Sequence, residues 1–191
     1  MTKVIAISGA SGAGKTTVLQ ALSDYFSCPS LYFDDHTDSS TYPANMKVWF
    51  ENGADLSEIN TPTLVSSLTE LIAQRPRYIF VEEPFGRERQ AVAWMIDYVV
   101  LLDTPLEFCL CRIIKRNADK NSSDPVHSVQ RYLAHYEDHL RDIYVSTVAR
   151  VRSNSDLIIK DPQPVSASVV EIANWLKSRE SVDQSPVVSV L

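Results

Sequence analysis

The sequence predicts an α/β fold in which a five-stranded parallel sheet lies between layers of helices. Two observations lead to this prediction. Five short apolar runs recur at wide spacing, and each is continuous rather than alternating, which is typical of strands buried on both faces. Amphipathic helical patterns separate these runs, and alternation of strands with helices indicates a doubly wound sheet. The length of 191 residues fits one domain with a proper core.

The elements are expected in the following order. Strands should occupy residues 4–8, 30–33, 78–81, 98–102 and 156–159, and helices residues 14–26, 62–73, 105–117, about 125–151 and about 165–177. Two helix starts are well marked, because Thr61 and Thr104 are each followed by proline at the first helical position. Residues 35–60 form a polar, irregular stretch, and long irregular insertions are usually functional or mobile. We expect a single domain over residues 1–179 and a disordered tail over 180–191.

Composition excludes several classes of protein. The formal net charge of −6 argues against nucleic acid as the main partner, because binding to the phosphate backbone relies on clustered lysine and arginine. No apolar run approaches the roughly 20 residues of a membrane helix. The three cysteines cannot all pair within the chain, so we expect reduced thiols, a cytoplasmic protein and no cysteine metal site. The sequence does not indicate an oligomeric state.

The first expected strand leads directly into a phosphate-binding motif. Residues 9–16 match the pattern G-x-x-x-x-G-K-[ST] and open the first expected helix. Glycines allow the backbone N–H groups to surround an anion, and the helix N-terminus adds its dipole. The motif predicts a P-loop NTPase with three α/β/α layers that binds ATP and Mg²⁺. The nucleotide-binding residues should be Gly9, Ala10, Ser11, Gly12, Ala13, Gly14, Lys15, Thr16 and Thr17.

Two pairs of carboxylates follow the next two expected strands. Asp34 and Asp35 end the second strand, and Glu82 and Glu83 end the third. Ligands of open α/β sheets bind beyond the carboxyl ends of the strands, so both pairs should lie beside the phosphate loop, defined here as residues 9–16. Carboxylates beside a phosphate would repel it, so they are expected to bind a metal ion or to take part in proton transfer. One member of each pair is expected instead to be a solvated or capping group.

Basic and aromatic residues complete the expected site. Arg112 and Arg116 share one face of their helix, and a polar stretch at 117–123 follows as a short lid. Arginines on a mobile lid stabilise charge during phosphoryl transfer; a solvated helix face is the alternative. Arg87 is expected either to contact a substrate anion or to form a surface salt bridge. Residues that could line an acceptor pocket are His36, Tyr42 and Trp49, with core packing as the alternative for Trp49.

Taken in order, these segments resemble the uridine kinase and phosphoribulokinase-like group, which includes nicotinamide riboside kinases. The resemblance rests on residues 4–17, 33–35, 79–82 and 100–105, together with Arg112, Lys115 and Arg116. It implies that Asp34 accepts the proton of the acceptor hydroxyl, that Glu82, Thr16 and Asp34 surround Mg²⁺, and that the two arginines act with Lys15 in catalysis. Asp35 and Glu83 then take neighbouring roles, either a substrate contact or none. Together with His36, Tyr42 and Arg87, which the residues themselves indicate, they are the candidate substrate contacts.

The sequence therefore predicts an ATP-dependent kinase that phosphorylates a hydroxyl of a small molecule, possibly a nucleoside. Asp35 remains the alternative base, and the choice between ATP and GTP stays open. A nucleotide-dependent regulatory NTPase is the alternative class. Neither the Asn-Lys-x-Asp segment of GTPases nor the Leu-Ser-Gly-Gly signature of transport ATPases occurs in the chain.

Overall fold

The computed structural model describes residues 2–119, 124–160 and 162–183. Its centre is a five-stranded sheet in the order β2-β3-β1-β4-β5, in which every neighbouring pair is parallel. The strands are β1 (Lys3–Ser8), β2 (Ser30–Leu31), β3 (Tyr78–Glu82), β4 (Tyr98–Asp103) and β5 (Leu157–Lys160). The predicted fold class and the predicted number of strands are confirmed.

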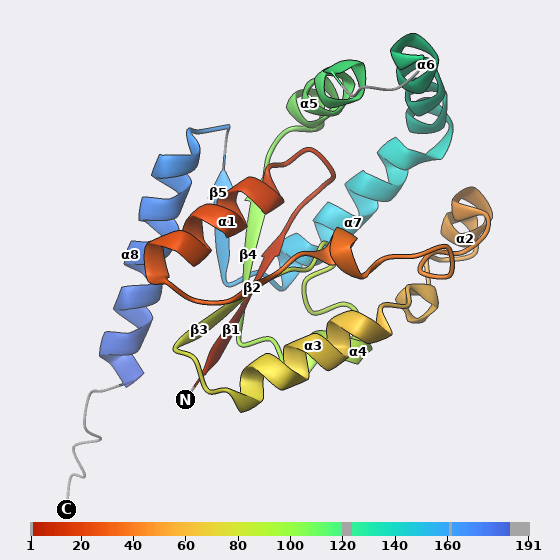
Figure 1. Cartoon of the computed structure of the whole chain (residues 1–191). Helices are drawn as coiled ribbons and strands as arrows, with labels where there is room; N and C mark the ends of the chain where they lie inside the picture. The colour runs from red at the N-terminus through yellow and green to blue at the C-terminus, as the bar shows by residue number, and fades with distance from the viewer. Residues whose placement is uncertain (1, 120–123, 161, 184–191) are drawn as a thin grey trace, which may run out of the picture.

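Helices cover both faces of this sheet (Figure 1). Because side chains alternate along a strand, Ile5 and Ile7 pack with the helices α1 (Lys15–Phe26) and α8 (Val165–Asp183) on one face. Val4 and Ala6 pack on the other face with α3 (Pro62–Ala73) and α7 (Arg141–Ser153). Burial on both faces explains why the strands are continuous apolar runs.

Four further helices and three short turns complete the described part of the chain. They are α2 (Met46–Glu51), α4 (Gln90–Ala93), α5 (Leu106–Asp119), α6 (Pro125–His135) and the short turns η1 (Phe33–His36), η2 (Leu56–Glu58) and η3 (Tyr136–Leu140). The insertion at 35–60 thus contains α2 and η2 between irregular segments. No helix in the described ranges is sufficiently long and apolar to cross a bilayer.

Three boundaries differ from the prediction. The second strand ends at Leu31, and residues 33–36 form a 3₁₀ turn instead. The single helix expected at 125–151 consists of α6 and α7 joined by the π-helical turn η3. Helix α8 continues to Asp183, so residues 180–183 of the expected disordered tail are helical. The rest of that tail and residues 120–123 of the expected lid lie outside the described residues.

Candidate active site

The phosphate loop connects β1 to α1 and faces a cavity of about 500 Å³. Gly14 occupies the N-cap of α1 with φ of 99°, which leaves the N-terminal N–H groups of the helix open to an anion. Gly12 has φ of 83°, and a Cβ atom there would collide with the carbonyl oxygen of Cys109 in α5. Glycine at position 12 therefore lets the loop pack directly on the helix that carries Arg112 and Arg116.

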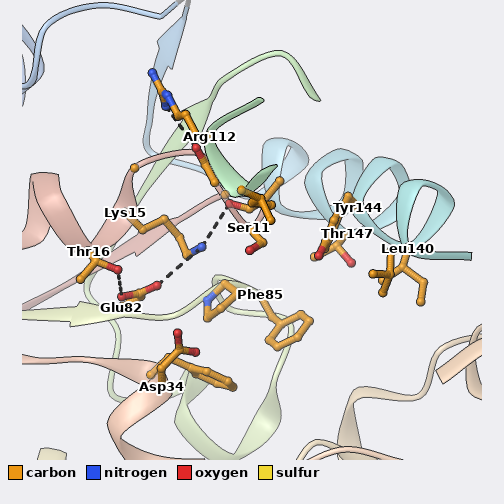
Figure 2. Close-up of a pocket in the computed structure, with 18 of the residues that line it drawn as sticks. Ser11, Lys15, Thr16, Asp34, Glu82, Phe85, Arg112, Leu140, Tyr144 and Thr147 are labelled. Atoms are coloured by element: carbon orange, nitrogen blue, oxygen red, sulfur yellow. Dashed lines mark hydrogen bonds and ion pairs between the residues drawn. The ribbon is translucent and has the colours of Figure 1, made fainter. Parts of the chain in front are cut away.

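Lys15, Thr16 and Glu82 form one connected group at the base of the cavity (Figure 2). Glu82 reaches this place because β3 lies beside β1, with Glu82 opposite Ile7 in register. The Thr16 hydroxyl donates to Glu82 Oε2 at 2.9 Å, and Lys15 Nζ lies 3.6 Å from Glu82 Oε1. Lys15 Nζ also donates to the carbonyl oxygen of Ala10 at 3.2 Å. The lysine is held in the loop, with its side chain only 8% exposed.

The donor set at this point fits Mg²⁺. A hydroxyl and a carboxylate supply hard oxygen ligands, and Mg²⁺ bound to a nucleotide takes one or two carboxylates and completes its shell with phosphate oxygens and water. The described residues contain no group of three or more His, Cys, Asp or Glu side chains arranged to hold a metal. A magnesium ion bound by Thr16 and Glu82 would therefore depend on a nucleotide for its remaining ligands.

The two aspartates separate at η1. Asp34 lines the cavity, whereas Asp35 lies in a shallow depression beside Thr17, Gln20 and Asp24. The sequence analysis placed both residues at the end of the second strand, and that placement is wrong because residues 33–36 form a 3₁₀ turn. In a 3₁₀ turn successive side chains point about 120° apart, which separates Asp34 from Asp35.

Glu83 points away from the cavity into a buried ion pair. Arg89 Nε donates to Glu83 Oε1 at 3.1 Å, and a terminal nitrogen of Arg89 donates to Glu83 Oε2 at 2.6 Å. The other terminal nitrogen donates to the Ile59 carbonyl oxygen at 3.1 Å and to Thr61 Oγ1 at 2.8 Å. Both side chains are 1% exposed. Burial raises the pKa of the Glu83 carboxyl, and the Arg89 guanidinium opposes that shift.

This ion pair corrects the sequence interpretation of Glu83 as a substrate contact, because both carboxylate oxygens are engaged by Arg89. Arg87 is also engaged elsewhere: it donates to the carbonyl oxygens of Ile96 and Asn154 and pairs with Asp156 at 2.8 Å. Neither residue lines the cavity. His36 lies outside it as well, with Nδ1 3.2 Å from Thr63 Oγ1.

Arg112 and Arg116 both line the cavity from α5. One terminal nitrogen of Arg112 donates to the carbonyl oxygens of Gly12 and Ala13, each at 3.1 Å. The guanidinium is thus held directly against the phosphate loop. This arrangement brings the two arginines, Lys15 and Asp34 to one cavity.

The opposite end of the cavity is apolar and aromatic. Of the expected acceptor residues, Tyr42 and Trp49 line the cavity, and Trp49 is also buried in the core, with 4% of its surface exposed. Burial, and secondarily the charge of Asp34, raise the pKa of Tyr42 to about 12, so its partly exposed phenol is a neutral hydrogen-bond donor at physiological pH. The sequence analysis missed further lining residues: Phe33, Met46, Pro84, Phe85, Ile113, Leu140, Ile143, Tyr144 and Thr147.

Comparison with known proteins supports the fold. No protein-family model and no curated protein sequence matches the chain. Among solved structures, an unliganded sugar kinase from Janibacter sp. HTCC2649 is 18% identical, with a TM-score of 0.56, over 93% of this chain and 95% of that one. Shikimate kinase from Aquifex aeolicus is 18% identical, with a TM-score of 0.52, over 93% and 98% of the two chains. The chain has the fold of these P-loop kinases. The finer resemblance to the uridine kinase-like group stays a prediction.

Proposed function

We propose that this chain is an ATP-dependent kinase that transfers the γ-phosphate to a hydroxyl of a small molecule, with Mg²⁺ as cofactor. One observation carries the proposal. A single cavity of about 500 Å³ combines the phosphate loop and the Lys15–Glu82–Thr16 group with the Asp34 carboxylate and a set of apolar and aromatic side chains that a second ligand could contact. A regulatory NTPase would need the phosphate loop and the Lys15–Glu82–Thr16 group, but it would not need a space for an acceptor beside a carboxylate.

The roles of the residues at the nucleotide end follow from their contacts. Loop N–H groups and Lys15 would bind the β- and γ-phosphates, and Lys15 would exchange its ion pair with Glu82 for the phosphate oxygens. Glu82 and Thr16 would then hold Mg²⁺, which neutralises charge on those oxygens. Arg112 and Arg116 would stabilise the charge that develops on the transferred group, since they line the same cavity.

A second cavity, next to the main one, could bind the nucleoside part of ATP. This second cavity, of about 250 Å³, begins at Gly14, Thr17 and Arg112 and extends to Pro162, Gln163 and Val165 after β5. It shares the N-terminal turn of α1 with the first cavity. A triphosphate wrapped in the loop would therefore direct its base toward the segment after β5 and its γ-phosphate toward Asp34.

Asp34 is the proposed general base. It would accept the proton of the acceptor hydroxyl while that oxygen attacks the γ-phosphorus. Asp35 remains the alternative because it is adjacent in sequence, but it does not line the cavity. Asp34 also lies on the side of the cavity where it could contribute to holding Mg²⁺. As for the acceptor itself, the resemblance implies a nucleoside, which makes uridine a necessary member of any substrate panel.

The proposal is tested by measuring ADP release from ATP–Mg²⁺ in the presence of nucleosides, vitamin ribosides, sugars, acids and simple alcohols. The account predicts at least one acceptor that stimulates ADP release and yields a phosphomonoester. Lys15→Ala is the matched control and should abolish the stimulation. ADP release that no acceptor stimulates would favour the regulatory NTPase.

A further inference from the structure

The wall of the acceptor end is made mostly of hydrocarbon. Its members come from four separate segments, namely η1, the α2 region, the turn after β3, and η3 with α7. The apolar and aromatic side chains are Phe33, Tyr42, Met46, Trp49, Pro84, Phe85, Leu140, Ile143 and Tyr144. Figure 2 shows Lys15, Glu82 and Asp34 at one end of the cavity, Tyr144, Thr147 and Leu140 at the other, and Phe85 between them.

The cations of the cavity come from the phosphate loop and from α5. Among the described residues, the basic side chains that line the cavity are Lys15, Arg112 and Arg116. Lys15 is paired with Glu82, and Arg112 is bound to loop carbonyl oxygens. Arg116 is assigned to the transferred phosphate, so that with ATP bound the charged side chain of the lining left for the acceptor is the Asp34 carboxylate. Burying an unpaired charge is strongly unfavourable, so the wall selects against anionic acceptors.

Arg89, which lies close behind this wall, does not change that conclusion. Its guanidinium is 5.2 Å from the centre of the Phe33 ring, and Arg89 does not line the cavity. Each of its three nitrogens already donates within the protein, to Glu83, to the Ile59 carbonyl oxygen or to Thr61. With 1% of the side chain exposed and its charge paired with Glu83, Arg89 cannot form a direct ion pair with a ligand.

Polar groups at the acceptor end are few, and several are already engaged. Trp49 Nε1 donates to the Asp55 carbonyl oxygen at 2.8 Å, and the Tyr144 hydroxyl lies 3.4 Å from that of Tyr132. The polar side chains left toward the acceptor are those of Asp34, Tyr42 and Thr147. A polyol or a nucleobase would bury more polar groups than these can pair, and burying an unpaired polar group is unfavourable.

We propose that the acceptor is an uncharged alcohol with a largely apolar body, such as an aromatic ring or a branched hydrocarbon, that presents one hydroxyl to Asp34. This inference rests on the proposed kinase activity and departs from the nucleoside that the sequence resemblance implies. The hydroxyl oxygen forms a bond to the γ-phosphorus, the bond from the γ-phosphorus to the β,γ-bridging oxygen breaks, and the hydroxyl proton passes to the Asp34 carboxylate. The products are ADP and the phosphomonoester of the alcohol.

The test compares apolar acceptors with polar and charged ones and uses the whole chain of 191 residues. The panel is 2-phenylethanol and 3-methyl-3-buten-1-ol as apolar alcohols, with uridine, glycerol, glucose and shikimate as polar or charged acceptors. We expect kcat/KM for the better apolar alcohol to exceed that of every polar acceptor by at least about tenfold. This is the preference that burial of one or two apolar groups of the acceptor against the wall would produce. A polar or charged acceptor that equals or surpasses both apolar alcohols would overturn this inference while leaving the kinase proposal intact. Acceptor-independent ADP release across the whole panel would overturn both.

A pair of leucines on the same helical run provides the matched variants. Leu140 lines the cavity, whereas Leu133 is 37% exposed and lies outside it. Leu140→Gln should raise KM for the apolar alcohol about tenfold and leave KM for ATP unchanged, because a polar amide replaces hydrocarbon at the acceptor wall only. Leu133→Gln should behave like the parent. An unchanged KM for the alcohol in Leu140→Gln, with the fold intact by circular dichroism, would contradict the inference.

Discussion

Replacing Arg89 by methionine should destabilise the protein strongly. Arg89 donates four hydrogen bonds to Glu83, Ile59 and Thr61, and the pair with Glu83 is 1% exposed on both sides. Removing one partner of a buried pair leaves the other charge uncompensated and costs about 3–5 kcal/mol. For a chain of this length the same loss lowers Tm by roughly 6–20 °C.

Arg152→Met is the control. Arg152 pairs with Asp103 at 2.7 Å, but the two side chains are 48% and 21% exposed, so the expected loss is about 0–1 kcal/mol. Urea unfolding followed by circular dichroism measures both variants. The double variant Glu83→Leu with Arg89→Met should recover much of the stability, because no charge remains buried. If Arg89→Met lost no more stability than Arg152→Met, the assignment of Arg89 and Glu83 as a structural pair would fail.

Three further predictions concern the nucleotide and the transfer step. Lys15→Ala should abolish productive binding of ATP–Mg²⁺ in calorimetry while the circular dichroism spectrum stays unchanged; binding as tight as the parent's would contradict the role of the loop. Glu82→Gln should raise the Mg²⁺ concentration needed for half-maximal activity, whereas Glu83→Gln should mainly lower the free energy of unfolding; identical Mg²⁺ titrations in the two variants would refute this difference. Asp34→Asn should reduce single-turnover transfer by about 10²–10⁴-fold, as loss of a general base does, and should retain ATP binding. If Asp34→Asn transferred phosphate nearly as fast as the parent while Asp35→Asn were inactive, Asp35 would be the base.

The sheet and its helices could be predicted because burial imposes a pattern on the sequence. Strand β1 is buried on both faces and is accordingly a continuous apolar run. Helix α3 begins and ends as predicted, since Pro62 at its first position fixes the start. Strand β2 was predicted too long because apolar character does not reveal how a residue is buried. Phe33 is 1% exposed, but it packs on Phe85 and Arg89 from a 3₁₀ turn and not within the sheet.

The phosphate loop could be predicted from local sequence, because consecutive residues build it. The acceptor end could not, because residues from η1, α2, the β3–α4 turn and α7 meet there only through tertiary packing. The same limit applies to Glu83 and Arg89, which pair across an irregular turn that has no periodicity. Sequence alone also gave no sign of the π-helical turn at Tyr136–Leu140, because the apolar residues keep three- and four-residue steps through it.

The most direct test of the central claim is to follow the γ-phosphate itself. With ATP labelled at the γ-position, Mg²⁺ and the best acceptor of the panel, the account predicts that the label appears in an organic phosphomonoester and that Lys15→Ala prevents this. Label found only in inorganic phosphate, with every acceptor tested, would show that the chain hydrolyses ATP without transferring its phosphate and would contradict the account.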